Sequence, residues 1–406
     1  MSNLVVSGGA PLSGKVIPSG SKNSALPIIF ATVLCRGVSV LYGVPDITDV
    51  RVSLEIISTL GASCTRIGEA LYIDTSDMEY NRPPLSLVTR IRASSYLLGS
   101  CVGRFGRAHI SAFGGCAFEN RPIDMHISAA QRLGCTVWDD LVLASSLVGT
   151  DIRFDKASVG ATVNTILLAS RAKGRTRIFG YAREMHIMNL ISFLRTAGAK
   201  ITLTDGYIEI EGRTLTGGVC RIIPDMIEAG TYLSLSLATG SDISVVASGT
   251  ELASFLAAMV DGGAVLTDSG GEIALSGSLS EPLRVTTAPH PGFPTDLQPQ
   301  TAPVMARYSG GEIIENVWRS RFGYLDELSK FGVEYTLMGN RAVIMPSRLH
   351  SAVAVACDLR AGAALLIAAL MAEGESVIKN AEVIDRGYER IIEKLRELGA
   401  KIERTE

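Results

Sequence analysis

The sequence predicts a two-domain α/β protein in which helices are buried and sheets lie outside, built from six repeated units, three in each domain. The first observation is a glycine followed by a short alternating strand, which recurs at nearly even intervals after an amphipathic helix. The copies are LGASCTRI from Leu60, LGCTVW from Leu133, AGAKITL from Ala197, GGAVLTD from Gly262, FGVEYTL from Phe331 and LGAKIER from Leu398. Glycine suits a helix C-terminus because it adopts positive φ without a Cβ clash, and the alternation after it is typical of a half-buried strand. Repetition at a fixed period predicts the architecture before any single motif is considered.

The second observation is a helix rich in small residues that precedes each amphipathic helix. The segments are SKNSALPIIFATVL, RASSYLLGSCVG, VGATVNTILLASRA, EAGTYLSLSLATG, TDLQPQTAPVMARY and LRAGAALLIAALMAEG. Ala, Gly and Ser let neighbouring backbones approach closely, so these helices are predicted to lie inside the domains. Each unit is therefore predicted to run as inner helix, strand, outer helix, strand, strand.

The two ends of the chain are predicted to share one domain. The opening LVVSGGAPLSGKVIP is typical of a strand hairpin without a preceding helix, and the last unit ends soon after its first strand, KIERTE. The N-terminal strands should therefore complete the C-terminal domain. The predicted domains are residues 20–224, with three repeats and a cysteine loop, and residues 1–19 plus 225–406, with three repeats and a catalytic aspartate. A ligand cleft is expected between the domains, and the two chain crossings suit a hinge.

Composition limits the classes of protein and partner. The chain has 406 residues, 38 Lys and Arg against 41 Asp and Glu, and a formal net charge of −3. This balance indicates no nucleic-acid or polybasic membrane surface. The N-terminus does not resemble a secretory signal, and no apolar run approaches the roughly 20 residues of a membrane-spanning helix. The seven scattered cysteines indicate free thiols in a reducing cytoplasm and match no usual zinc spacing. We expect a cytoplasmic protein, a monomer or weak oligomer, that acts on small molecules.

Lys22 lies in the Gly/Ser turn PSGSKNS, which opens the first inner helix. Backbone N–H groups at a helix N-terminus favour an anion, and Lys22 adds a full positive charge. An ordinary helix cap with a solvated lysine explains the same residues about equally well.

A glycine-flanked cysteine, Cys116 in FGGCAFEN, stands apart from the other six, which lie in apolar or helical contexts. Arg121 and Asp124 follow it in RPIDMH. An exposed thiol beside a cation has a lowered pKa yet still holds a proton for donation. The alternative is an inert small hydrophobic residue, and the loop context weakens it.

Asp296 follows a proline-rich approach, PHPGFPTD, at the start of another inner helix. A carboxylate there is a natural helix cap, and it is equally suited to accept a proton from a substrate hydroxyl. Arginines also begin or adjoin helices, and there they oppose the helix dipole unless an anion or an ion pair is present. They are Arg92, Arg321, Arg360 and Arg386, with Asp358 and Asp385 as the nearby candidates for simple salt bridges.

These motifs resemble those of the enolpyruvyl transferases that act on UDP-N-acetylglucosamine. The matching segments run in order from about Leu4 to Arg404: GSKNSALP, RFGRAHIS, GGCAFENRPIDMHI, KASVGAT, IIPDMIEAGTY, PHPGFPTDLQPQ, DLRAGAAL and IDRGYER. The resemblance implies a fold of two inside-out α/β barrels, in agreement with the repeats. The related shikimate-pathway enzyme shares that fold, but its motif set differs.

The resemblance implies transfer of the enolpyruvyl group of phosphoenolpyruvate to the 3-hydroxyl of UDP-N-acetylglucosamine with release of phosphate. This is the first committed step of peptidoglycan synthesis, and it needs no metal or organic cofactor. By matching position, Cys116 donates a proton to the methylene carbon and is the fosfomycin target, while Asp296 deprotonates the acceptor hydroxyl. Lys22, Arg121 and Arg386 hold the phosphate, with Arg321 and Arg360 near the carboxylate. The implied contacts to the nucleotide sugar are Asn23, Arg92, Arg121, Pro122, Ile123, Asp124, Met125, Lys156, Ser158, Val159, Gly160, Thr295, Asp296 and Val317.

Several positions depart from the family pattern, mainly on the acceptor side and in the cysteine loop. They are Ser95-Tyr96, Phe113, Phe118-Glu119, Met185-His186, Met226 and Trp318-Arg319. These departures leave two alternatives. One is a related enzyme that modifies another uridine nucleotide, for example in nucleoside-antibiotic synthesis. The other is a catalytically silent relative that binds a uridine nucleotide.

Overall fold

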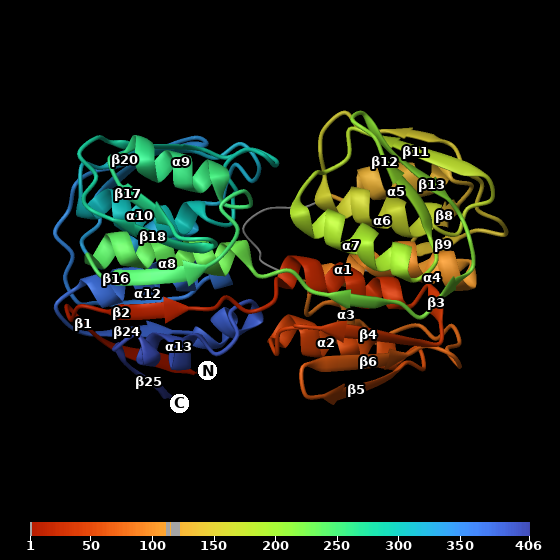
Figure 1. Cartoon of the computed structure of the whole chain (residues 1–406), viewed down its shortest axis with the longest axis horizontal. Coiled ribbons are helices and arrows are strands. Elements are labelled where there is room, and N and C mark those ends of the chain that lie inside the picture. Colours follow the sequence, from red (N-terminus) through yellow and green to blue (C-terminus); the bar gives the residue numbers. More distant parts are fainter. Residues whose placement is uncertain (1, 111–113, 115–121) are drawn as a thin grey trace. The chain divides into compact units, whose positions relative to one another are not determined.

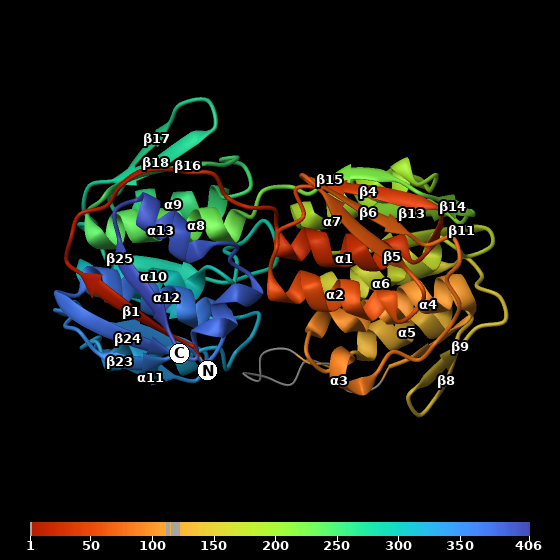
Figure 2. The same ribbon diagram turned by 90° about the horizontal axis from the view of Figure 1, so that it is seen from below.

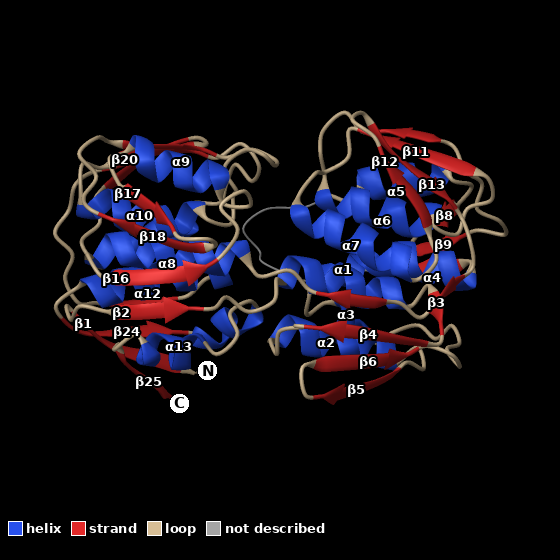
Figure 3. Cartoon of the chain, viewed as in Figure 1, coloured by secondary structure: helices blue, strands red, loops and turns tan. Residues whose placement is uncertain are grey.

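The structure, a computed structural model, describes residues 2–110, 114 and 122–406. The chain divides into two compact units, which we call the central unit, Gly20–Ile223, and the terminal unit, Met1–Ser19 with Pro224–Glu406. In each unit a group of helices is wrapped by sheets (Figure 1). Colouring by secondary structure makes the same layering visible, with strands around a group of inner helices and further helices at the periphery (Figure 3). Cys116 and Arg121 lie outside the described residues.

The inner helices are buried along nearly their whole length, as the small-residue segments predict. Arg360, in α12, is even the largest fully buried side chain described. The inner helices of the central unit are α1 (Lys22–Thr32), η1 (Arg92–Tyr96) continued by α4 (Leu97–Phe105), and α6 (Val159–Ala169). Those of the terminal unit are α8 (Met226–Thr239), α10 (Gln298–Arg307) and α12 (Leu359–Met371).

Outer helices and short helical turns complete the units. In the central unit they are α2 (Thr48–Ser58), α3 (Leu85–Val88), α5 (Asp124–Arg132) and α7 (Met185–Thr196). In the terminal unit they are α9 (Ala253–Asp261), α11 (Gly323–Ser329), η2 (Ala381–Arg386) and α13 (Ile391–Glu397). None of the described helices is long and apolar enough to cross a lipid bilayer.

The two four-stranded sheets of the central unit share one plan, in which a parallel pair is followed by antiparallel strands, whereas β7–β9–β8 is antiparallel throughout. The described sheets are β10–β11–β13–β12, β15–β4–β6–β5, β7–β9–β8 and the small pair β14–β3. Their strands are β3 (Cys35–Arg36), β4 (Val38–Tyr42), β5 (Ser63–Ile67), β6 (Ala70–Asp74), β7 (Arg107–His109), β8 (Thr136–Trp138), β9 (Leu141–Leu143), β10 (Asp151–Arg153), β11 (Arg175–Phe179), β12 (Lys200–Leu203), β13 (Tyr207–Glu211), β14 (Leu215–Thr216) and β15 (Val219–Arg221).

The terminal unit repeats the plan with sheets β17–β18–β16–β2, β19–β20–β22–β21 and β23–β24–β1–β25. Their strands are β1 (Asn3–Gly8), β2 (Ser13–Val16), β16 (Asp242–Val246), β17 (Val265–Asp268), β18 (Glu272–Ser276), β19 (Leu283–Thr286), β20 (Gly311–Ile314), β21 (Tyr335–Met338), β22 (Arg341–Ile344), β23 (Val353–Val355), β24 (Gly374–Lys379) and β25 (Lys401–Thr405). Figure 2 shows the protruding β17 and β18 pair and, in a different sheet, the adjacent strands β24, β1 and β25.

The repeated glycines adopt the backbone conformation that the sequence predicts. All six have positive φ and stand between an outer helix and a strand: Gly61, Gly134, Gly198, Gly263, Gly332 and Gly399. A side chain at these positions would be strained, which explains why glycine recurs there.

The N-terminal strands complete the terminal unit, but the predicted hairpin between them is wrong. β1 lies antiparallel between β24 and β25, whereas β2 pairs in parallel with β16 in another sheet. The intervening chain crosses the end of α12 so closely that a Cβ on Gly8 would lie 2.0 Å from the Ala369 carbonyl oxygen. Hydrogen bonds to distant strands therefore replace the local pairing that adjacency in sequence suggests.

The packing of α4 against α6 predicts a destabilising substitution. A Cβ on Gly99 would lie 2.8 Å from both Asn164 Oδ1 and Leu167 Cβ. Gly99→Ala should therefore lower the free energy of unfolding by about 1–3 kcal/mol in urea denaturation, because a packed interface must move apart. The control is Gly206→Ala in a turn with open space, where a change below about 0.5 kcal/mol is expected. Equal stability of the two variants would contradict this account of the interface.

Candidate active site

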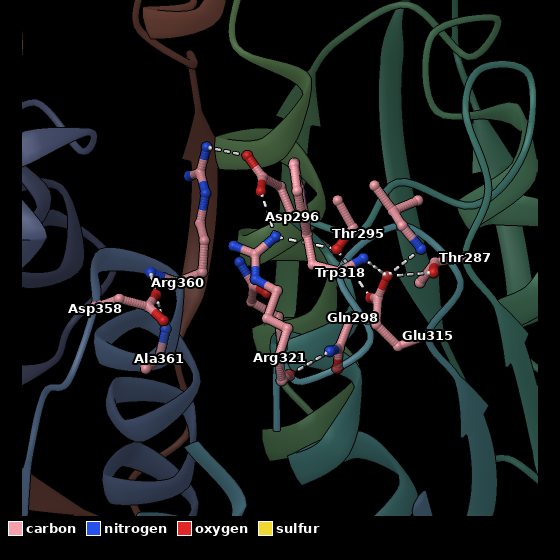
Figure 4. Close-up of polar contacts among 12 residues, drawn as sticks. Thr287, Thr295, Asp296, Gln298, Glu315, Trp318, Arg321, Asp358, Arg360 and Ala361 are labelled. Carbon is pink, nitrogen blue, oxygen red and sulfur yellow. Dashed lines mark hydrogen bonds and ion pairs between the residues drawn. The ribbon is translucent and has the colours of Figure 1, made fainter. Parts of the chain in front are cut away.

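In the terminal unit the carboxylate of Asp296 lies between two buried arginines. Arg321 Nη1 donates to Asp296 Oδ1 at 2.7 Å, and Arg360 Nη2 donates to Asp296 Oδ2 at 3.2 Å (Figure 4). The side chains of Arg321 and Arg360 are 6% and 1% exposed. Asp296 does not cap α10, which begins at Gln298 without a side-chain cap, so the capping interpretation is wrong. The contacts instead assemble a triad of two cations and one anion.

Arg360 is held from several directions but keeps unused donors. Its Cζ lies 5.2 Å from the centre of the Tyr388 ring, and the Tyr388 hydroxyl contacts Thr231 at 2.9 Å and Gln300 at 3.1 Å. Nε and Nη1 of Arg360 have no hydrogen-bond partner among the described residues. Burial opposes the charge of Arg360, but Tyr388, Asp296 and Asp225 outweigh it and raise the pKa. A permanently charged group with unused donors can bind an anion.

Arg321 also stays charged within the core. Burial again disfavours the charge, but Asp296 and then Asp358 raise the pKa of Arg321 above its ordinary value. The Asp358 carboxylate itself accepts from the backbone N–H groups of Arg360 and Ala361 at 2.8 and 3.0 Å, and so caps α12. Asp358 thus acts as a helix cap, not as a simple side-chain salt bridge to Arg360.

A buried glutamate that the sequence analysis missed organises the same region. Glu315 Oε1 accepts from Thr287 Oγ1 at 2.7 Å and from the N–H groups of Val317 and Trp318 at 2.8 and 2.9 Å. Glu315 Oε2 accepts from Thr295 Oγ1 at 2.9 Å (Figure 4). These contacts lock the segment that carries Thr295 and Asp296 to the turn that leads to Arg321.

The structure therefore brings together Thr295, Asp296, Val317, Arg321 and Arg360 within the terminal unit. Arg386 is the half-buried last residue of η2, two positions before Tyr388. Asp385 pairs with Arg404 through two short contacts of 2.6 and 2.7 Å. No sequence signal marked Glu315, since a polar residue at the end of a strand is ordinary.

In the central unit Lys22 is not a solvated lysine. Its Nζ lies 3.6 Å from Asp49 Oδ2, and the two side chains are 12% and 4% exposed. Lys22 is the first residue of α1, which has no acidic residue in its first turn and no side-chain cap. Asn23 follows it and is half-buried. Asp49, at the start of α2, is a second residue that the sequence analysis missed.

Other predicted residues of the central unit gather around His126 in α5. A Cβ on Gly160 would lie 2.8 Å from His126 Cε1, and His126 Nδ1 lies 2.8 Å from Asn164 Nδ2. Burial, then Arg92, lowers the pKa of His126 to about 4, and Asp124 opposes the shift. Ser158 caps α6 by accepting from Ala161 N–H at 3.3 Å, and Val159 and Gly160 begin that helix. Lys156 and Pro122 are exposed, and Ile123 and Met125 are half-buried.

Buried Glu315 is expected to stabilise the terminal unit. Glu315→Gln loses a charged acceptor for four donors and should lower the free energy of unfolding by roughly 2 kcal/mol in urea denaturation. The matched control is Glu312→Gln on β20, which ends immediately before Glu315; there the ion pair with half-exposed Arg341 contributes less than about 1 kcal/mol. If Glu315→Gln is no less stable than Glu312→Gln, the four hydrogen bonds that Glu315 accepts do not stabilise the terminal unit.

His126 predicts a pH dependence of stability. Because its pKa is about 4 in the folded state and about 6.5 in the unfolded state, its full contribution is present above pH 6.5 and lost as the pH falls towards 4. From pH 7 to 4.5 the wild type should lose about 2.5 kcal/mol more stability than His126→Gln. Urea unfolding at the two pH values measures the difference, and equal losses would refute the burial of a neutral imidazole.

The described residues contain no group of three or more His, Cys, Asp or Glu side chains suited to a metal ion.

A profile of the EPSP synthase (3-phosphoshikimate 1-carboxyvinyltransferase) family matches residues 6–395. The UDP-N-acetylglucosamine 1-carboxyvinyltransferase 1 of Streptococcus agalactiae is 40% identical over 419 residues, with full coverage of both chains. The UDP-N-acetylglucosamine 1-carboxyvinyltransferase of Halothermothrix orenii is 39% identical over 414 residues, again with full coverage.

Among solved structures, the enolpyruvyl transferase NikO from Streptomyces tendae has a TM-score of 0.89 and 28% identity. The match covers 100% of this chain and 99% of NikO. These findings confirm the resemblance inferred from the motifs and the inside-out α/β fold in two domains. The chain thus belongs to the enolpyruvyl transferase family, and within it to the UDP-N-acetylglucosamine 1-carboxyvinyltransferases.

Proposed function

We propose that this enzyme transfers the enolpyruvyl group of phosphoenolpyruvate to the 3-hydroxyl of UDP-N-acetylglucosamine and releases inorganic phosphate, the first committed step of peptidoglycan synthesis. The relatives at about 40% identity over the full chain carry that activity in their names. The observation that carries the proposal is Asp296 held between Arg321 and Arg360. A fixed carboxylate is suited to deprotonate a hydroxyl, and the excess positive charge beside it is suited to a substrate anion.

The proposed steps use side chains at matching family positions. Cys116 gives a proton to the methylene carbon of phosphoenolpyruvate, and the neighbouring carbon becomes oxocarbenium-like. The acceptor 3-oxygen attacks that carbon while its proton passes to Asp296, which gives a tetrahedral phospholactoyl intermediate. Loss of phosphate and of a methyl proton then forms the enol ether. Cys116 lies outside the described residues, so its role rests on the motif alone.

The proposed contacts to the two substrates are likewise assigned by matching family positions. Lys22, Arg121 and Arg386 hold the phosphate of phosphoenolpyruvate, and Arg321 and Arg360 hold its carboxylate. The remaining predicted residues of the central unit, with Thr295 and Val317, hold the nucleotide sugar. The buried Lys22–Asp49 pair supports this placement of Lys22, because it aligns the ammonium at the start of α1 without a competing helix cap.

A second candidate is an enzyme that modifies another uridine nucleotide. It is favoured by the change at Ser95-Tyr96, where the family usually has an aromatic Trp. Ser95 is buried and its carbonyl accepts from Asn164, while Tyr96 packs edge-on against Phe30. Ser95 and Tyr96 thus pack within the core, and the bulky Trp side chain that the family usually has here is missing from the acceptor side.

The activity assay distinguishes the candidates. Purified protein should release phosphate from phosphoenolpyruvate with UDP-N-acetylglucosamine, and Asp296→Asn should slow turnover by about 10²–10⁴-fold because the base is lost. Asp242→Asn, an exposed position on β16, is the matched control and should keep wild-type turnover. Phosphate release only with another uridine nucleotide would overturn the proposed acceptor, and no release with any of them would support a silent relative.

The proposed role of Cys116 predicts a single covalent adduct with fosfomycin. Intact-mass analysis should show one adduct on the wild type and none on Cys116→Ser. Cys357→Ser is the control and should still be modified at Cys116. Cys357 is exposed overall, but partial burial of its thiol and then Asp358 raise the pKa of that thiol to about 11, which suppresses its thiolate. An unmodified wild type, or an adduct that survives Cys116→Ser, would contradict the assignment.

A further inference from the structure

The ring of His126 has one defined tautomer, set by the amide of Asn164. Asn164 Oδ1 accepts from the Gly99 N–H at 2.8 Å, so the other end of the amide is the NH₂ group. That group donates to the Ser95 carbonyl at 3.1 Å and to His126 Nδ1 at 2.8 Å. Nδ1 must therefore carry a lone pair, and the single proton of the neutral imidazole lies on Nε2.

The Cε1–Nε2 edge of this ring lies against the first turn of α6. A Cβ on Gly160 would be 2.9 Å from His126 Nε2, so only glycine permits such an approach. His126 is 6% exposed, and its Nε2 has no hydrogen-bond partner among the described residues. The ring is largely buried and its Nε2–H has little access to water, so an acceptor is expected in the complete enzyme.

The first turn of α6 supplies neighbouring donors. The Ser158 side chain satisfies Ala161 N–H, whereas the N–H groups of Val159 and Gly160 precede the first hydrogen bond within the helix. The turn has no acidic residue, and α6 is long enough to carry a helix dipole. Of the charged side chains that act on His126, Arg92 is a cation and Asp124 is exposed. The Nε2–H of His126 thus lies beside the first turn of α6, which is suited to bind an anion.

We propose that His126 Nε2–H donates a hydrogen bond to a diphosphate oxygen of the acceptor nucleotide at the start of α6, with Asn164 as the positioning residue that fixes the tautomer. This inference rests on the proposed function for the identity of the ligand. His126 stays neutral at physiological pH because its pKa is about 4.

Binding of UDP and of uridine to the full chain, measured by calorimetry without phosphoenolpyruvate, tests the proposal. His126→Ala should weaken UDP binding by about tenfold or more, because the lost hydrogen bond is to a charged group. Uridine, which has no phosphate, should bind the variant as it binds the wild type. His126→Gln should restore most of the UDP affinity, since the glutamine amide reaches the position of Nε2. The control His109→Gln removes a ring that contacts Tyr80 at 2.6 Å in the same unit and should leave UDP affinity unchanged.

Equal weakening of UDP and uridine binding in both His126 variants would overturn the proposal and indicate a structural role only. Long-range ¹H–¹⁵N spectra give an independent readout that needs no variant: Nδ1 should resonate as an unprotonated nitrogen and Nε2 as a protonated one. The reverse tautomer would also overturn it. A wild type that binds UDP through His126 yet releases no phosphate would refute the proposed function and leave this inference intact.

Discussion

The ion triad of Asp296, Arg321 and Arg360 imposes the main constraint on the terminal unit. Two guanidiniums are removed from water, and one carboxylate lies between them. Burying a charge is expensive unless it is paired and hydrogen-bonded, and here Asp296 pairs with both cations while Tyr388 covers one face of Arg360. The triad itself carries a net positive charge, and Nε and Nη1 of Arg360 have no hydrogen-bond partner within the part of the chain that the structure describes. That imbalance favours an anionic ligand, as the proposed binding of phosphoenolpyruvate requires.

The N-termini of the inner helices are capped differently in the two units. In the terminal unit the carboxylates of Asp225 and Asp358 cap α8 and α12, so those helix dipoles are already satisfied and the arginines supply the positive charge. In the central unit α1 has no side-chain cap, α6 is capped by a neutral serine, and neither has an acid in its first turn. Their backbone N–H groups can themselves bind phosphate groups.

The repeated architecture could be predicted because each unit carries a local signal. The glycines after the outer helices must adopt positive φ, and the small residues of the inner helices mark close packing. The predicted N-terminal hairpin is wrong because the strands that pair with β1 and β2 are distant in sequence. The candidate residues Lys22, Asp296, Arg321 and Arg360 could be found from their positions at helix starts. Glu315, Asp49 and Asn164 could not, since each acts through contacts made only in three dimensions.

A crystal structure of the enzyme with phosphoenolpyruvate bound tests the central claim most directly. The excess charge of the triad predicts that the substrate carboxylate lies about 3 Å from Arg360 Nη1 or Nε and also contacts Arg321, while Asp296 keeps its place between them. A bound phosphoenolpyruvate that touches neither guanidinium would contradict the account.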